Sequence, residues 1–250
     1  MVRILLNGCN GKMGRVITSC VEERDDCEIV AGFDIKPEMH SYFPVFTSYN
    51  DFKGEADVII DFSHPSSLEG LLSFALLRHL PVVVATTGLS DEQIKLVHAT
   101  AQKIPVFFSA NMSLGVNLMA ELIKKAAAVL GQNFDVEIVE AHHNQKIDAP
   151  SGTALMLADA VNTVFEEEKV YQYDRHSQRK KRDKNEIGIH AIRGGTIVGE
   201  HEVIFAGRDE ILTVSHSARS KEIFAVGAVR AALFLLGKPA GLYNMASVVG

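Results

Sequence analysis

Cysteine is scarce in this sequence. The 250 residues include three cysteines, Cys9, Cys20 and Cys27, and all of them lie within the first 27 positions. An odd and sparse set is not a disulfide framework, and no spacing among the three is typical of a zinc-binding pair. We therefore expect reduced thiols and a cytoplasmic protein.

Long hydrophobic runs and excess positive charge are also missing. No apolar run reaches the ~18–20 residues of a membrane span, and residues 1–8 are too short for a signal peptide. The net charge is −6, which argues against a nucleic-acid or membrane-surface partner. The basic run 175–183 has no interleaved aromatic residues, so we interpret it as a solvated loop. The remaining composition, 47% hydrophobic and 22% charged, is typical of a globular protein.

Short runs rich in Val, Ile and Phe alternate with amphipathic segments through the first 130 residues. The predicted strands are 2–7, 28–34, 57–63, 81–88 and 105–111. A capping box, Ser90 with Gln93 three residues later, indicates the start of one of the intervening helices. Strands that are apolar throughout are buried on both faces. The repeated strand–helix units therefore predict an α/β fold with a Rossmann-type, doubly wound parallel sheet.

The pattern changes after residue 134. We expect a strand at 135–141, a helix at 154–168 and an antiparallel meander over 189–218. A last helix at 221–237 can return to the first domain. These elements predict a smaller α+β domain with a mixed sheet. The predicted division is a dinucleotide-binding domain of residues 1–112, completed by 221–250, and a second domain of residues 113–220.

Three glycines, Gly8, Gly11 and Gly14, follow the first strand and open the first helix. Glycine there permits a tight turn, close approach of the backbone to a pyrophosphate, and helix–strand packing. The helix N-terminus then presents N–H groups to phosphate, so Asn10, Lys12 and Met13 join the predicted contacts. The spacing G-x-x-G-x-x-G is a weak signal alone, but an acid at the end of the second strand, Asp34, strengthens it.

Other strand ends add candidate cofactor contacts. Ligands of open α/β sheets lie outside the carboxyl ends of the strands. The predicted contacts there are Thr86, Thr87, Gly88, Ser109, Ala110, Asn111 and Met112. Phe62 and Ser113 are ordinary loop residues in our interpretation. Asp34 favours NADH because it repels a 2′-phosphate, whereas Lys36 can accept one, so NADH and NADPH both stay open.

The segment EAHHNQKIDAPSGTA, residues 140–154, is the most polar stretch of motif-like sequence. Lys146 supplies a positive charge, and Ser151, Gly152 and Thr153 follow Pro150 at the start of a helix, where N–H groups and hydroxyls bind anions. This combination predicts a carboxylate or phosphate site.

The two histidines of that segment extend the hypothesis. His143 makes a ligand with more than one carboxylate plausible, and His142 remains as a proton donor because imidazole titrates near neutrality. A zinc site would need a third ligand such as Asp148, and no spacing here is typical of one. We keep zinc as the lesser alternative.

These residues carry a family resemblance. GCNGKMG (8–14), Asp34, ATTG (85–88), SANMSLGVN (109–117) and above all EAHHNQKIDAPSGTA resemble 4-hydroxy-tetrahydrodipicolinate reductase, also called dihydrodipicolinate reductase. The resemblance extends over most of the chain. It implies a two-domain, homotetrameric cytoplasmic enzyme of diaminopimelate and lysine biosynthesis, with subunits that pair through the second domain. Such an enzyme reduces a cyclic imine dicarboxylate with NADH or NADPH.

The resemblance also implies residue roles. His142 matches the family's proton donor or acceptor, and Lys146 its second proton donor or charge stabiliser. The residues that match the family's carboxylate contacts are His143, Ser151, Gly152 and Thr153. The chain departs from the family pattern at Ala85, where glycine is usual, and at Cys9 and Asn10 in the cofactor loop. It has no arginine after Asp34, which disfavours strong use of NADPH.

Two other classes of function stay open at this point. A different Rossmann enzyme would use the histidines on another substrate, for example an aspartate-like compound or a sugar. A nucleotide sensor would keep the cofactor fold without catalysis, although His142 and Lys146 are both present. Arg193, Gly194 and Gly195 either approach the substrate or form a hairpin turn.

Overall fold

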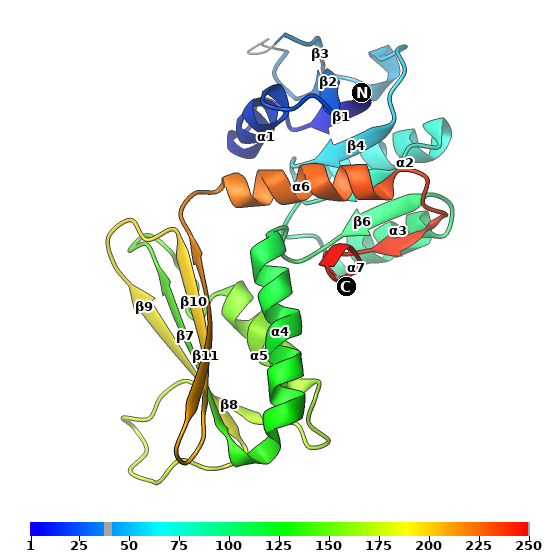
Figure 1. Ribbon diagram of the computed structural model, residues 1–250. Coiled ribbons are helices and arrows are strands. Elements are labelled where there is room, and N and C mark those ends of the chain that lie inside the picture. Colours follow the sequence, from blue (N-terminus) through cyan, green and yellow to red (C-terminus); the bar gives the residue numbers. More distant parts are fainter. Residues whose placement is uncertain (38–41, 250) are drawn as a thin grey trace. The chain divides into compact units, whose positions relative to one another are not determined.

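The computed structural model describes residues 1–37 and 42–249. The chain forms two compact units (Figure 1). Unit 1 comprises Met1–Ser113 together with Glu222–Val249, and unit 2 comprises Leu114–Lys221.

Unit 1 is built on a seven-stranded sheet in which every pairing is parallel. The strand order is β3-β2-β1-β4-β5-β6-β12. The strands are β1 (Val2–Asn7), β2 (Cys27–Phe33), β3 (Val45–Phe46), β4 (Val58–Asp61), β5 (Val82–Val84), β6 (Pro105–Phe108) and β12 (Gly241–Tyr243). The order of the first six is that of a dinucleotide-binding Rossmann sheet. The predicted fold class is confirmed, while the short edge strands β3 and β12 were not predicted.

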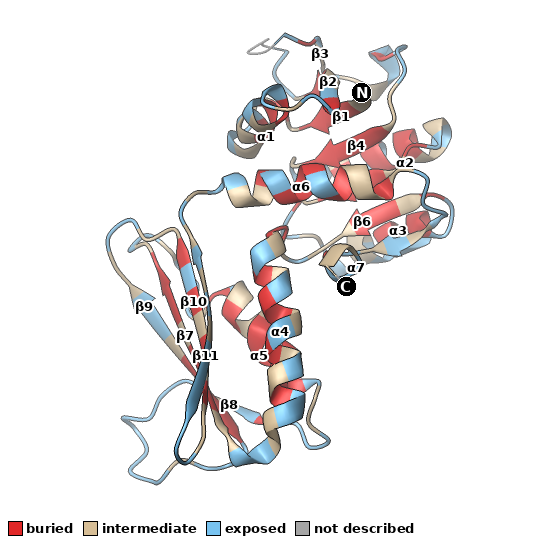
Figure 2. Ribbon diagram, viewed as in Figure 1, coloured by how far each residue is buried: buried red, intermediate tan, exposed pale blue. Residues whose placement is uncertain are grey.

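Helices cover both faces of this sheet, as a doubly wound fold requires. The helices are α1 (Lys12–Glu22), α2 (Leu68–Arg78), α3 (Asp91–Ala101), α6 (Glu222–Leu235) and α7 (Ala246–Val249), with short 3-10 turns η1 (Tyr49–Asp51) and η2 (Pro65–Ser67). α2 and α3 share a buried cluster with Leu5, Ile59 and Val106 of the strands. α6 packs on the opposite face, where Phe234 contacts Phe107 edge to face. Figure 2 shows the central strands as the most buried part of the unit.

The predicted capping box is confirmed. The Ser90 side chain accepts from the Gln93 backbone N–H, and the Gln93 side chain accepts from the Ser90 N–H. The Gln93 side chain also donates to the Pro65 carbonyl at 2.7 Å. Gln93 therefore stabilises the first turn of α3 and also connects this helix to the loop after β4.

Unit 2 is a five-stranded mixed sheet with α4 (Leu114–Leu130) and α5 (Gly152–Asn162) on one face. A 3-10 turn, η3 (Gly131–Asn133), follows α4. The strands are β7 (Asp135–His142), β8 (Val170–Gln172), β9 (Glu186–Arg193), β10 (Gly199–Ala206) and β11 (Ile211–Ala218). Their order is β11-β10-β7-β9-β8, with β7, β8 and β9 mutually parallel and β10 antiparallel to both neighbours.

The predicted antiparallel meander over 189–218 is therefore wrong in part. Only β10 and β11 form a hairpin, because β7 lies between β9 and β10. The connection after β9 crosses the end of β7, where the Gly194 N–H donates to the His142 carbonyl at 2.9 Å and the Asn144 N–H donates to the Gly195 carbonyl at 3.2 Å. Hydrogen bonds to a distant segment decide this path, and no local pattern shows them.

The predicted helix 154–168 also differs from the observed α5. The helix begins two residues earlier because the Ser151 hydroxyl accepts from the Ala154 N–H at 3.2 Å and caps it. It ends at Asn162, whose side chain bonds to both the backbone N–H and the carbonyl of Lys169. The Asn162 side chain thus bonds to the backbone of Lys169, the residue just before β8, at the point where the helix ends.

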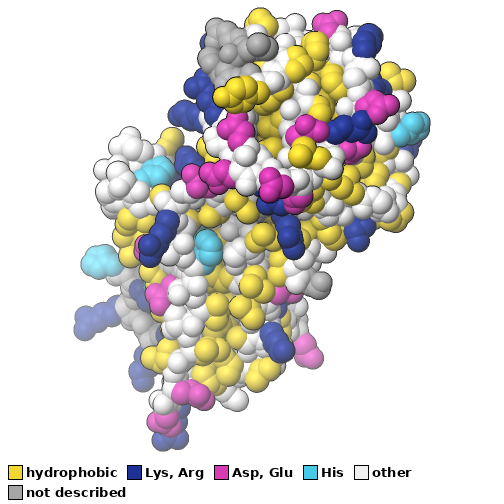
Figure 3. All heavy atoms as spheres, turned by 45° about the horizontal axis from the view of Figure 1, so that its top comes forward, with side chains coloured by type: hydrophobic (Ala, Val, Ile, Leu, Met, Phe, Trp, Pro, Cys, Tyr) yellow, Lys and Arg dark blue, Asp and Glu magenta, His cyan; other side chains and the backbone are white. Residues whose placement is uncertain are grey.

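The basic run 175–183 is more than a solvated loop. Arg182 donates to Asp135 at 2.8 Å and to Glu137 at 2.9 Å, and Arg175 bonds to Glu137 and Glu186. These ion pairs attach the run to β7 and β9, whereas Arg179 is exposed. On the face drawn in Figure 3, basic and acidic side chains are interspersed. Among the helices of the described residues, none is long and apolar enough to cross a membrane.

Candidate active site

The glycine loop of unit 1 has no room for side chains at two of its three glycines. Gly8 has φ +80°, and a Cβ there would lie 2.6 Å from the Phe62 carbonyl oxygen. A Cβ on Gly14 would lie 2.3 Å from the Gly8 oxygen. Gly11 precedes α1, which has no side-chain cap. The loop therefore brings backbone N–H groups close to the helix N-terminus, the arrangement that binds a pyrophosphate.

A pocket of about 400 Å³ opens beside this loop at the carboxyl ends of β1, β2 and β4. Gly8, Gly11 and Asp34 line it together with residues that were not among the predicted cofactor contacts. Those additional residues are Asn7, Phe33, Ile35, Thr47, Tyr49, Phe62, Ser63, His64, Ser66 and Ser67. Glycine loop and acid thus meet in one cavity, as the sequence predicted for a dinucleotide.

Asp34 is held by backbone donors at the end of β2. Its carboxylate accepts from the Asn10 N–H at 3.0 Å and from the Lys36 N–H at 3.2 Å, and the Asn10 side chain donates to the Lys36 carbonyl at 2.8 Å. The acid is half-buried in a pocket wall and has a fixed position. It can accept hydroxyl hydrogen bonds from a ribose.

Thr86 faces away from solvent, unlike its neighbours. Its hydroxyl donates at 2.7 Å to Asp61, a fully buried carboxyl at the end of β4. Asp61 also accepts from the Asn7 amide at 2.8 Å and the Ser63 hydroxyl at 2.5 Å, and burial raises its pKa. Asp61 therefore joins the end of β1 to the loops that follow β4 and β5. Thr87 and Gly88 are exposed in the next turn.

The loop after β6 is stabilised by hydrogen bonds between its own residues. The Ser109 hydroxyl donates to the Asn111 carbonyl at 3.0 Å, and the Asn111 side chain accepts from the Ser113 N–H at 2.8 Å. Ala110 is exposed, but Met112 is only 5% exposed. A Cβ on Gly227 of α6 would lie 1.7 Å from the Met112 oxygen. Met112 is thus part of the packing with α6.

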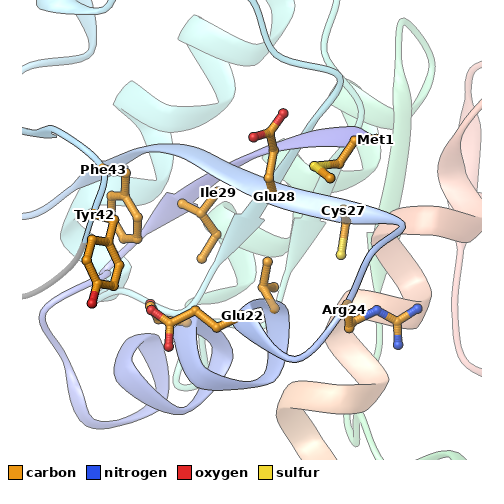
Figure 4. Close-up of a pocket in the computed structure, with 10 residues that line it drawn as sticks. Met1, Glu22, Arg24, Cys27, Glu28, Ile29, Tyr42 and Phe43 are labelled. Atoms are coloured by element: carbon orange, nitrogen blue, oxygen red, sulfur yellow. The ribbon is translucent and has the colours of Figure 1, made fainter.

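A second pocket of unit 1, of about 310 Å³, lies between α1 and β2 (Figure 4). Glu22 at the end of α1 and Arg24 just after it line this pocket together with Cys27, Glu28 and Ile29 of β2. None of the predicted cofactor residues lines it. The pocket at the strand ends, not this one, contains the glycine loop.

In unit 2, His142 is the last residue of β7 and is almost fully buried. Its Nδ1 lies 2.7 Å from Oε2 of Glu140, two residues earlier on the same face of the strand. Glu140 has no solvent exposure. The side chain of the predicted proton donor is therefore oriented by a buried carboxylate.

Arg193 of β9 is paired in register with His142 and forms a fork on Glu140. Its two terminal nitrogens lie 2.8 and 2.7 Å from the two carboxylate oxygens, and one of them also donates to the Asp148 carbonyl at 2.6 Å. Burial alone would raise the pKa of Glu140. Hydrogen bonds from Arg193, His142 and the Ser151 N–H outweigh it and hold that pKa below its usual range.

Ser151 connects the anion-binding turn to the same carboxylate. Its backbone N–H donates to Glu140 Oε1 at 3.0 Å, and its hydroxyl lies 3.1 Å from Nε2 of His201 on β10. Gly152 and Thr153 form the first turn of α5 beyond it. Burial, with a smaller contribution from the charge of His142, lowers the pKa of His201 to about 4, so this ring is neutral at pH 7. Its centre lies 5.2 Å from that of His142.

Lys146 lies in the turn after β7. Its Nζ lies 3.0 Å from Asp148, and the salt bridge lowers the pKa of that acid. The Lys146 N–H donates to the His143 carbonyl at 3.1 Å. The structure thus places Lys146 and His143 in one turn. Arg193 connects this turn to Glu140, because it donates to both the Asp148 carbonyl and the Glu140 carboxylate.

Sequence reasoning missed the residues that organise both sites. Glu140 was part of the quoted motif, and its position two residues before His142 on a strand was an available signal. Arg193 was left open, since only the pairing of β7 with β9 brings it to Glu140. Asp61 and His201 gave no signal in the sequence. Among the described residues, no group of three or more His, Cys, Asp or Glu could hold a metal ion.

Family models for the N- and C-terminal domains of dihydrodipicolinate reductase match residues 2–112 and 115–249. The chain belongs to the dihydrodipicolinate reductase family. A 4-hydroxy-tetrahydrodipicolinate reductase from Caldanaerobacter subterraneus subsp. tengcongensis is 53% identical over 249 residues, covering 100% of this chain and 98% of the relative. Another from Clostridium tetani is 52% identical, covering 98% and 96%.

Solved structures agree with this membership. A dipicolinate-bound dihydrodipicolinate reductase from Paenisporosarcina sp. TG-14 superposes with a TM-score of 0.84 at 26% identity, covering 100% of both chains. A DAP dehydrogenase from C. glutamicum shares the fold, with a TM-score of 0.57 at 13% identity over 98% of this chain and 93% of the other. The predicted family is confirmed, and with it the oxidoreductase class and a nicotinamide nucleotide cofactor. The tight glycine loop and its pocket fit such a cofactor.

Replacing Gly8 by alanine tests the loop. The side chain would strain a left-handed residue and push against the Phe62 carbonyl, so we expect NADH affinity to fall about tenfold, equivalent to ~1.4 kcal/mol. Gly237→Ala is the matched control, because Gly237 has φ +71° and open space around a Cβ. Fluorescence titration with NADH measures both variants. Equal losses of affinity in the two would show that backbone strain, not the site, is responsible.

Proposed function

We propose that this chain reduces 4-hydroxy-tetrahydrodipicolinate to tetrahydrodipicolinate, with loss of water, in diaminopimelate and lysine biosynthesis. The observation that carries the proposal is the shared anchor in unit 2. One buried carboxylate, Glu140, bonds both to His142 and to the backbone of Ser151 at the start of the anion-binding turn. A proton donor and a carboxylate site are thereby tied together, in a family whose named members act on this compound.

The substrate class follows from the charges of the turn. We propose that Ser151, Gly152 and Thr153 at the N-terminus of α5 bind one carboxylate of the substrate, with His143 as a further contact. Lys146 supplies a positive charge from the adjoining turn. The solved relative from Paenisporosarcina is named as binding dipicolinate, a cyclic dicarboxylate, which supports this assignment.

The proposed chemistry of the residues is proton donation and charge stabilisation. The substrate loses its 4-hydroxyl group as water to give a conjugated imine. Reduction then adds a hydride to this imine and leaves negative charge on the conjugated system. His142 donates the proton that neutralises this charge, and Lys146 stabilises it electrostatically. In our proposal Lys146 exchanges the exposed Asp148 for the substrate carboxylate, since a salt bridge to an exposed acid contributes little stability.

The nicotinamide cofactor, when bound, supplies the hydride. We propose that unit 1 holds it through three sets of residues. The loop contacts are Gly8, Asn10, Gly11, Lys12, Met13 and Gly14. The contacts at the other strand ends are Asp34, Thr86, Thr87, Gly88, Ser109, Ala110, Asn111 and Met112. Within these sets Thr86 acts through Asp61 and Met112 through its backbone, because both side chains are buried.

We propose NADH as the preferred form. Asp34 presents a fixed carboxylate in the pocket wall, and this carboxylate would repel a 2′-phosphate. The contact of Lys36 with the Asp34 carboxylate is made by the Lys36 backbone N–H. The charge of Asp34 therefore dominates this end of the pocket.

We also propose that the chain forms a cytoplasmic homotetramer through unit 2. The sheet face opposite α4 and α5 carries Val139, Ile192 and Ile204, and Ile192 is 51% exposed. The three free cysteines accord with a reducing compartment.

Sedimentation equilibrium is expected to give four chains per particle, and a monomer at micromolar concentration would contradict the assembly.

Removing the imidazole of His142 tests the function. With substrate formed in situ from pyruvate and aspartate semialdehyde, the wild-type chain is expected to oxidise NADH, and His142→Ala to lower kcat by about 10²–10⁴-fold, as for loss of a general acid. NADH affinity should be kept. His190→Ala is the control, because His190 makes a similar 2.7 Å contact with Glu137 on the same sheet. No oxidation of either NADH or NADPH by folded wild-type protein would refute the assignment.

Asp34→Asn tests the cofactor preference. The amide removes the negative charge and keeps one oxygen, which can accept from the Asn10 N–H. The ratio of kcat/KM for NADPH to that for NADH should therefore rise about tenfold or more, or ~1.4 kcal/mol. The exposed acid Asp25 provides the control variant Asp25→Asn, for which no change of the ratio is expected. An unchanged ratio in Asp34→Asn would remove Asp34 as the determinant.

A further inference from the structure

Glu140 makes more contacts than orienting one histidine requires. Its Oε2 faces His142 Nδ1 at 2.7 Å and one nitrogen of Arg193 at 2.8 Å. Its Oε1 faces the Ser151 N–H at 3.0 Å and the other nitrogen of Arg193 at 2.7 Å. The carboxylate therefore joins β7, β9 and the start of α5. Arg193 extends the connection through the Asp148 carbonyl to the turn that carries Lys146.

The charge of Glu140 determines which nitrogen of His142 carries a proton. An ionised carboxylate can only accept hydrogen bonds, so Nδ1 of His142 must be the donor in this contact. Nε2 is then the nitrogen that is left to give and take a proton. That nitrogen borders Gly199, where a Cβ would lie 3.1 Å away.

We propose that Glu140, clamped by Arg193, is the positioning residue of the active site: it fixes the tautomer of His142 and sets the carboxylate-binding turn at Ser151 in register with it. This inference rests on the proposed role of His142 as proton donor. It assigns a role to two residues, Glu140 and Arg193, that do not themselves touch the substrate. Altering a carboxylate that orients a metal-bound histidine costs about 10–100-fold in affinity or activity, and we expect a loss of the same order for a histidine that transfers a proton.

The same strand contains a matched comparison. Glu137 also accepts from a histidine, His190 at 2.7 Å, and from two arginines, Arg175 at 2.7 Å and Arg182 at 2.9 Å. It lies on the opposite face of β7, because it is three positions from Glu140 and side chains alternate between the two faces of a strand. Neutralising Glu137 removes an equivalent ionic cluster without altering the His142 contact.

Glu140→Gln should reverse the tautomer of His142. Each oxygen faces one Arg193 nitrogen, but the Ser151 N–H at Oε1 can only donate, whereas the His142 ring at Oε2 can become an acceptor, so the amide oxygen takes the Oε1 side. The amide NH₂ then faces His142 Nδ1, which must accept, and the proton moves to Nε2. The variant thus keeps the hydrogen bond to the anion-binding turn while it changes the nitrogen that is available for proton transfer.

The experiment compares full-length wild type, Glu140→Gln and Glu137→Gln by steady-state kinetics and by ¹⁵N NMR of histidine-labelled protein at alkaline pH, where imidazole is neutral. His142 is assigned by its absence from His142→Ala. We expect Glu140→Gln to lower kcat about 10–100-fold, with a change in KM for the dicarboxylate below about threefold and unchanged NADH affinity. We expect its His142 proton on Nε2. Glu137→Gln should keep the wild-type kcat and the Nδ1–H tautomer.

Two results would overturn the proposal. One is a normal kcat in folded Glu140→Gln, and the other is an equal loss of kcat in Glu137→Gln, which would indicate a general effect of lost stability. If Glu140→Gln does not fold, the wild-type spectrum decides: a neutral His142 with its proton on Nε2 refutes the inference, and one with Nδ1–H supports it. A normal rate in His142→Ala would instead remove the proposed function on which the inference rests.

Discussion

The need to satisfy a buried carboxylate dominates the end of unit 2 that carries His142 and Ser151. A charge without solvent exposure is costly unless opposite charge and hydrogen-bond donors surround it. Glu140 meets this need with Arg193, His142 and the Ser151 N–H, which come from three different segments. Breaking any one of them would leave the charge underpaired, so these segments are held in a single arrangement.

Unit 1 contains a parallel case. Asp61 is equally buried, but the side chains that donate hydrogen bonds to it, Asn7, Ser63 and Thr86, are uncharged. Asn7 is the last residue of β1, next to the glycine loop, and Ser63 and Thr86 belong to the loops after β4 and β5. In both units a carboxyl group at the end of a strand ties together the loops on which we place the contacts to ligands. The sheets supply rigid positions, and the buried acids align the loops upon them.

Much of the fold was predictable because its causes are local. Apolar runs of strand length, the capping box at Ser90 and the glycine spacing after the first strand are properties of neighbouring residues, and the Rossmann-type sheet followed from them. The end of α5 and the path from β9 to β10 were not predictable in this way. Asn162 ends the helix by bonding to Lys169, and the Gly194 turn crosses β7 by bonding to His142. Both depend on residues brought together by folding.

The sequence by itself determined the family, the cofactor loop and the segment that carries His142, Lys146 and Ser151, since these are contiguous motifs with a direct chemical meaning. Only the tertiary structure decided how the histidine is held. Arg193 is 53 residues from Glu140 along the chain, and the parallel register of β7 and β9 sets them side by side. Likewise, Thr86 turns toward Asp61 only because β4 and β5 are neighbours. Strand pairing depends on residues far apart in the sequence, whereas the chemistry of a motif depends on consecutive residues.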